Sequence, residues 1–180
     1  MEFSFDADIA GPLERVWELL RDRLTDLVPY LPTIDTIAEV ERVVDGPRTR
    51  IVNAWQGNSA GVPPFARPFA TKAMTAWHDH AEWDTEARTV RWRFEPHRFA
   101  KLYTCGGLNF VRALDAQTTR LELRGSLVIH PEHLPLPGPL ARRYAPRIGE
   151  WAIAKIQPNL LQVPKAVQAF FDHERGLAQA

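Results

Sequence analysis

Two segments rich in tryptophan, residues 73–83 and 89–96, constrain the fold of this chain more than any other feature. Both alternate apolar and polar residues, which is the period of a β-strand, and a short turn separates them. If Trp83 lies opposite Val90, the large apolar side chains of both strands share one face, whereas oppositely charged residues pair on the other. We therefore predict an antiparallel hairpin with one apolar face, in a register that both faces support.

Other segments have the same alternation. It predicts a strand over residues 2–9, a hairpin from residues 34–44 and 48–56, and two late strands near 102–113 and 119–130. The first of the late strands contains a pair of glycines, Gly106 and Gly107, and such pairs often mark a bulge or a close approach of two backbones. After the first strand and helix, we expect six or so antiparallel strands.

Two segments have the spacing of amphipathic helices. The first follows Pro12 and covers residues 13–24, and the second runs from Ile148 to Phe170. Pro158 and Pro164 predict a kink or a break in the second helix. It is long enough to cover the apolar face of the sheet. The resulting order of elements is that of an α+β fold.

Composition bounds the class of protein. The 180 residues suit one domain, which we place at residues 1–175 with a disordered tail at 176–180. Lys plus Arg number 22 and Asp plus Glu number 22, so the overall charge offers no argument for a nucleic-acid partner. The single cysteine favours a reducing compartment, and the sequence has no secretory or membrane-spanning segment, so we expect a cytoplasmic protein without stable membrane insertion. We expect it to be a monomer or a homodimer.

The chain resembles the START-like/Bet v 1-like (SRPBCC) superfamily, near its small bacterial members. The resemblance covers nearly the whole chain and depends on the order of its motifs: Ala10-Gly11-Pro12 with Val16-Trp17, Trp83-Asp84 before Trp92, Cys105-Gly106-Gly107-Leu108, and Trp151 to Leu161. It implies a helix-grip fold, in which a curved antiparallel β-sheet wraps around a long C-terminal α-helix. It also implies a hydrophobic cavity between sheet and helix, in which relatives bind lipids, sterols, plant hormones or polyketides. The superfamily has no universal catalytic motif to transfer.

Large aromatic residues and a few polar ones are expected to line this cavity. Tryptophan makes a good cavity wall with an N–H left for a polar partner, although the same residues could form a solid aromatic core. Asp79 shares the apolar face of the hairpin and could orient a ligand or transfer a proton, or lie at a hydrated rim. The predicted ligand-binding residues are Trp55, Trp77, Asp79, Trp83, Trp92, Phe94, Tyr103, Asn109 and Trp151.

Histidine and cysteine suggest no further chemistry. His78 and His80 lie on the charged face of the hairpin with Glu82, so we interpret them as part of a solvated outer face and predict no metal site. Cys105 lacks a neighbouring histidine base in the sequence, and we interpret it as a small buried thiol.

The sequence thus predicts a protein that binds or carries a small hydrophobic or amphipathic molecule, lipid-like or polyketide-like, without a cofactor. Two proline-rich loops, residues 57–71 and 131–139, are candidates for gates to the cavity. The alternative is an enzyme of the polyketide cyclase or aromatase type that uses the same cavity, with no catalytic residue assigned. A third possibility is a protein whose pocket is collapsed and filled by side chains.

Overall fold

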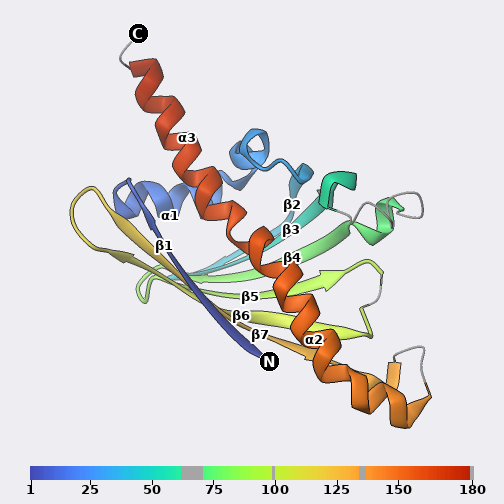
Figure 1. Cartoon of the computed structure of the whole chain (residues 1–180). Helices are drawn as coiled ribbons and strands as arrows, with labels where there is room; N and C mark the ends of the chain where they lie inside the picture. The colour runs from blue at the N-terminus through green and yellow to red at the C-terminus, as the bar shows by residue number, and fades with distance from the viewer. Residues whose placement is uncertain (62–70, 99, 134–136, 179–180) are drawn as a thin grey trace.

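The computed structural model describes residues 1–61, 71–98, 100–133 and 137–178, with backbone alone at residues 148 and 151–159. Seven strands form one antiparallel sheet in the order β1-β7-β6-β5-β4-β3-β2, so β1 and β2 are the edges (Figure 1). Their bounds are β1 Glu2–Ile9, β2 Ile34–Asp45, β3 Arg48–Gly57, β4 Ala76–Asp84, β5 Thr89–Pro96, β6 Tyr103–Ala113 and β7 Thr119–Ile129. The predicted α+β helix-grip architecture is confirmed.

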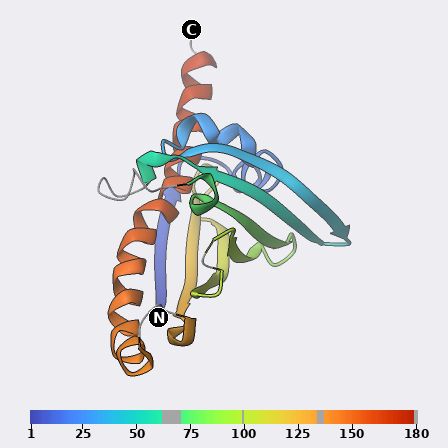
Figure 2. The same ribbon diagram turned by 90° about the vertical axis from the view of Figure 1, so that its right-hand side faces the viewer.

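Three α-helices accompany the sheet. They are α1 Leu13–Asp22, α2 Gly138–Leu160 and α3 Gln162–Ala178. The short 3-10 helices within the described residues are η1 Leu24–Tyr30, η2 Ser59–Gly61, η4 Lys72–Met74 and η5 Pro131–His133. Helices α2 and α3 follow one another along one side of the sheet, and α3 projects beyond it (Figures 1 and 2). We call the sheet face that these helices and α1 cover the inner face.

The long C-terminal helix differs from its prediction at its start. It begins at Gly138 rather than near residue 148, so the end of the predicted loop 131–139 is helical. Pro139 falls in the first helical turn, where the missing N–H removes no hydrogen bond, and it therefore does not delay the helix. The predicted break is confirmed: α2 ends at Leu160, and α3 starts at Gln162 with Pro164 in its first turn.

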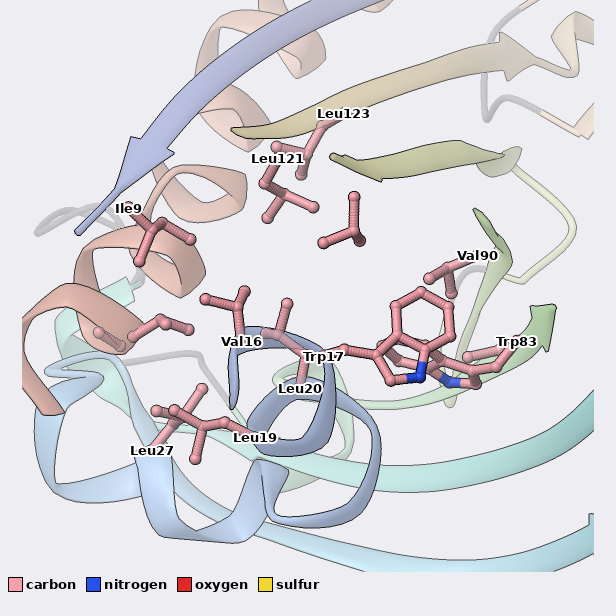
Figure 3. Close-up of a cluster of buried hydrophobic side chains, with 14 of the residues drawn as sticks. Ile9, Val16, Trp17, Leu19, Leu20, Leu27, Trp83, Val90, Leu121 and Leu123 are labelled. Atoms are coloured by element: carbon pink, nitrogen blue, oxygen red, sulfur yellow. The ribbon is translucent and has the colours of Figure 1, made fainter. Parts of the chain in front are cut away.

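Helix α1 builds the main core against the inner face. Its spacing of apolar residues buries Val16, Trp17, Leu19 and Leu20 on one side. Trp17 packs edge-on against Trp83 of β4, with ring centroids 5.0 Å apart (Figure 3). This contact between helix and sheet shows directly which face of β4 is the inner one.

Helix α3 is held against the start of α1 by contacts around Gly11. A Cβ atom at Gly11 would lie 2.6 Å from the Phe171 ring, so a larger residue would push the helix away. The Gln168 Oε1 atom accepts a hydrogen bond of 2.8 Å from the backbone N–H of Ala10, and Arg175 donates to the Ala10 carbonyl over 3.0 Å. Glycine at this position therefore fixes how closely the C-terminal helix approaches the sheet.

The predicted register of the tryptophan hairpin is confirmed. Trp83 lies opposite Val90, and on the other face His80 lies opposite Arg93. The His80 Nε2 atom lies 2.7 Å from the Glu95 carboxylate. We call this charged face the outer face.

The paired glycines mark a close approach of backbones without a bulge. The register of β6 with β5 and β7 continues unbroken through Gly106 and Gly107. A Cβ atom at Gly107 would overlap the backbone carbonyl of Arg124 on the neighbouring strand. The glycines therefore permit tight contact between strands rather than a change of register.

Parts of the predicted loops and of the tail fall beyond the described residues. Residues 62–70 of the first proposed gate and residues 134–136 of the second lie outside the described ranges. The gates therefore remain predictions. Helix α3 continues to Ala178, so residues 176–178 of the expected tail are helical, and residues 179–180 lie outside the described part.

Candidate functional site

The candidate site is a row of side chains across the centre of the inner face. Asp79 lies opposite Asn53 of β3 on one side and opposite Phe94 of β5 on the other. Cys105 continues the row on β6. Side chains opposite one another in antiparallel strands have Cβ atoms about 5 Å apart, so the Asp79 carboxylate is set among largely apolar neighbours.

Four aromatic rings follow one another around Asp79, and we call them the aromatic arc. Trp55 and Trp77 are stacked, with centroids 5.5 Å apart and planes 16° from parallel. Trp77 meets Phe94 edge-on at 6.4 Å, and Phe94 lies 4.9 Å from Trp92. The arc provides flat apolar walls on both sides of one carboxylate.

Polar atoms on this face are buried without hydrogen-bond partners. Among the described residues, they include the Oδ1 atom of Asp79 and the Nε1 atoms of Trp55, Trp77 and Trp83. Buried polar atoms in folded proteins nearly always have a partner, because an unpaired one costs about 1–3 kcal/mol. A molecule bound beside Asp79, Trp55 and Trp77 would supply partners for the unpaired atoms of these three residues.

Burial changes the acidity of Asp79. It disfavours the charged carboxylate and raises the pKa of Asp79 from 3.8 to about 7. Within the described ranges, no Lys, Arg or His lies on the inner face of β3 to β6 to offset this effect. Asp79 therefore exchanges a proton near neutral pH, as a general acid or base does.

The remaining predicted polar residues have more ordinary surroundings. The Trp92 Nε1–H group donates a hydrogen bond of 2.8 Å to the Asn109 Oδ1 atom, which orients the ring of the arc. Burial raises the pKa of Tyr103, and the neighbouring Cys105 contributes. Burial also raises the pKa of the Cys105 thiol to about 11, which makes it a poor nucleophile and agrees with the predicted inert thiol.

The predicted site residues divide into three groups. The carboxylate, the arc and Tyr103 lie on the same part of the sheet, and Asn109, in the row of Val90 and Trp83, joins them through its hydrogen bond with Trp92. Trp83 packs on Trp17 of α1, in the same buried cluster as Trp55. The side chain of Trp151 lies outside the described residues.

Sequence reasoning missed Asn53. It is a buried polar residue, 7% exposed, directly opposite Asp79. Its place between Ile51 and Trp55 in the alternation of β3 was the available signal, because a polar residue at an inner position is unusual.

One hollow in the described part of the chain lies on the outer face. It measures about 820 Å³, and its walls combine charged residues such as Arg50, His80 and Arg91 with apolar ones such as Val52 and Leu108. The sheet separates this hollow from Asp79. The predicted inner cavity would be bounded by α2, whose residues 148 and 151–159 are described by backbone alone, so it stays a prediction.

The described residues contain neither a metal-binding cluster nor a membrane-spanning helix. In those ranges, no group of three or more His, Cys, Asp and Glu side chains could hold a metal ion. No helix there is long and apolar enough to cross a membrane.

Solved structures of distant sequence resemble this chain over nearly its whole length. The Zhui aromatase/cyclase from Streptomyces sp. R1128 has a TM-score of 0.65 at 19% identity, covering 94% of this chain and 92% of that one. A protein from Thermus thermophilus has a TM-score of 0.61 at 24% identity, covering 100% and 99%. A START superfamily protein from Mycobacterium smegmatis has a TM-score of 0.55 at 13% identity, covering 96% and 97%.

These similarities establish the START/Bet v 1-like helix-grip fold. At such low identity they show the fold alone, since one fold supports many functions. No protein-family model matches the sequence, and a comparison with curated proteins finds no relative. The function must therefore be argued from the site.

Proposed function

We propose that this protein binds a small, mainly hydrophobic molecule between the inner face of the sheet and the C-terminal helix. The observation that carries the proposal is the set of unpartnered polar atoms within the aromatic arc and beside it. Folded proteins pair nearly all buried polar atoms, and although the N–H groups of Trp17 and Trp83 beneath α1 are also unpaired, Asp79 is the one carboxylate among the unpaired atoms of the described residues. A pocket that recognises a ligand combines apolar walls with a few polar groups of this kind.

The apolar surface supplies affinity and the polar atoms supply orientation. Each Å² of apolar area removed from water contributes roughly 25 cal/mol, so a ligand that covers the arc gains several kcal/mol. The indole N–H groups of Trp55 and Trp77 offer donors to ligand oxygen atoms, and Asp79 offers an acceptor. One of the proteins of similar fold is named an aromatase/cyclase, which fits a polyketide-like ligand as well as a lipid-like one.

Native mass spectrometry of the protein purified from its own cells tests the proposal. We expect a bound molecule of low mass that denaturation releases. We also expect neutral hydrophobic probes such as 4-phenylbutanol to raise the melting temperature. Trp77→Ala, in the arc, should abolish this rise, whereas Leu108→Ala, on the outer face of the same sheet, should keep it. A ligand-free mass together with no response to any hydrophobic probe would contradict the proposal and favour a filled pocket.

A second candidate function is catalysis of the cyclase or aromatase type. It is favoured by the pKa of Asp79, about 7, because a general acid or base works best with a pKa near the operating pH. Incubating the released molecule with fresh protein tests it. Conversion by the natural chain but not by Asp79→Asn would support catalysis, and unchanged ligand with both would leave binding alone.

A further inference from the structure

Asp79 stands apart from every other carboxylate that the structure describes in detail. Its Oδ1 atom is buried without a hydrogen-bond donor, and its direct cross-strand neighbours are Asn53 and Phe94. Carboxylates that form ion pairs in the described ranges include Asp8, at the surface with Arg120, and Glu122, half-covered by Arg112 and Arg124. An ionised carboxylate only accepts hydrogen bonds, so what it lacks is a donor.

The protein offers no positive charge to this carboxylate in the described part of the inner face. On β2, Arg42 lies on the same side of the sheet and is already paired with Glu39 and Asp22. Strands β3 to β6 carry no described basic residue on this face. Among the described residues of these strands, none compensates the charge of Asp79, and a cationic ligand would do so.

The rings beside Asp79 suit a cation as well. The faces of tryptophan and phenylalanine attract a cation within about 6 Å of the ring centre, and the attraction grows when the pair is removed from water. Trp77 precedes Asp79 on the same face of β4, and Phe94 lies opposite it. A carboxylate with aromatic rings as neighbours can hold an ammonium group through both kinds of attraction.

We propose that the ligand carries a protonated amine, which the Asp79 carboxylate binds against the rings of Trp77 and Phe94. The inference rests on the proposed function, because the apolar body of the amine lies along the same inner face. Carboxylic acids are disfavoured by repulsion from Asp79. Neutral molecules gain the apolar contacts but leave the carboxylate without an ionic partner.

Three matched probes test the charge preference: 4-phenylbutylamine, 4-phenylbutanol and 4-phenylbutyrate, measured by calorimetry near pH 8. A charge-assisted hydrogen bond is worth about 1.5–3 kcal/mol, so the amine should bind about ten- to hundredfold more tightly than the alcohol, and the acid most weakly. Asp79→Asn should reduce the affinity for the amine to about that for the alcohol. Glu82→Gln, which removes a carboxylate from the outer face of the same strand, should leave the order unchanged.

The possible results separate this inference from the proposed function. If amine and alcohol bind equally, or if the preference for the amine survives in Asp79→Asn, the inference is wrong and the binding function stands. If none of the probes binds, both are wrong. If the acid binds best, the charge at the site has the opposite sign to the one inferred.

The dependence on pH provides a second readout. Because the carboxylate must be ionised, the affinity for the amine should rise about tenfold from about pH 6 to about pH 8, with proton release at the lower pH. The other described titratable groups on this face are Tyr103 and Cys105, which stay neutral in this range, and Glu39, paired with Arg42 on β2. An affinity for the amine that stays constant over this range would contradict the role of Asp79.

Discussion

Asp79 should make the folded protein less stable as the pH rises, and Asp79→Asn should remove this effect. Burial raises the pKa of the carboxyl from 3.8 to about 7 in the folded state. Between these two values the folded chain holds the proton and the unfolded chain releases it. Rising pH therefore favours unfolding within this window, and the loss is complete above the folded pKa.

The size of the effect follows from the shift. One pKa unit corresponds to about 1.4 kcal/mol. The raised pKa of Asp79 therefore lowers the free energy of unfolding by about 4 kcal/mol near pH 8.5 and by about 2 kcal/mol near pH 5. The free energy of unfolding of Asp79→Asn, relative to the natural chain, should therefore increase by about 2–3 kcal/mol between these pH values. This comparison cancels the contributions of all other titrating groups that the substitution leaves unchanged.

Urea unfolding followed by circular dichroism measures the difference. The ligand-free protein is needed, because a ligand that binds Asp79 would stabilise the natural chain selectively. Glu82→Gln removes a carboxylate from the outer face of the same strand. Its difference in free energy of unfolding from the natural chain should not increase with pH. A difference between Asp79→Asn and the natural chain that stays constant from pH 5 to pH 8.5 would refute the buried state of this carboxyl.

Three further predictions concern the surroundings of the site. Asn109→Ala should destabilise the fold by about 1–3 kcal/mol and change the tryptophan fluorescence, because the N–H of Trp92 loses its acceptor; unchanged urea unfolding would contradict this. Gly107→Ala should prevent folding or cost several kcal/mol in thermal unfolding, because its Cβ would overlap a neighbouring backbone, whereas Gly138→Ala, in open space, should be nearly neutral. Cys105, 2% exposed, should resist iodoacetamide in the native protein near pH 8 and react in urea; rapid native alkylation would show that the thiol is accessible.

Much of the architecture was predictable because strand alternation is a local signal. The hairpin of β4 and β5 is the clearest case: placing Trp83 opposite Val90 satisfied the apolar face and the charged face together, and this is the register observed. The start of α2 was not predictable in the same way. Pro139 by itself indicates a loop, and whether it begins a helix depends on the turn that follows it.

The candidate site shows the same division. Alternation alone placed Asp79 among tryptophans, on the face opposite to His80. It did not reveal Asn53, whose importance depends on the pairing of β3 with β4 across residues far apart in the chain. Nor did it reveal that Trp83 packs on Trp17 of α1.

The amino-acid sequence by itself determined the order of elements, the two faces of the sheet and the residue types on each, because these follow from periods of two and of 3.6 residues. The tertiary structure alone decided which of these residues meet. It stacked Trp55 on Trp77, paired Trp92 with Asn109 and left the Oδ1 atom of Asp79 without a hydrogen-bond partner. The physical reason is that burial and hydrogen-bond satisfaction are properties of neighbours in space, and pairing between strands brings together residues that no local pattern connects.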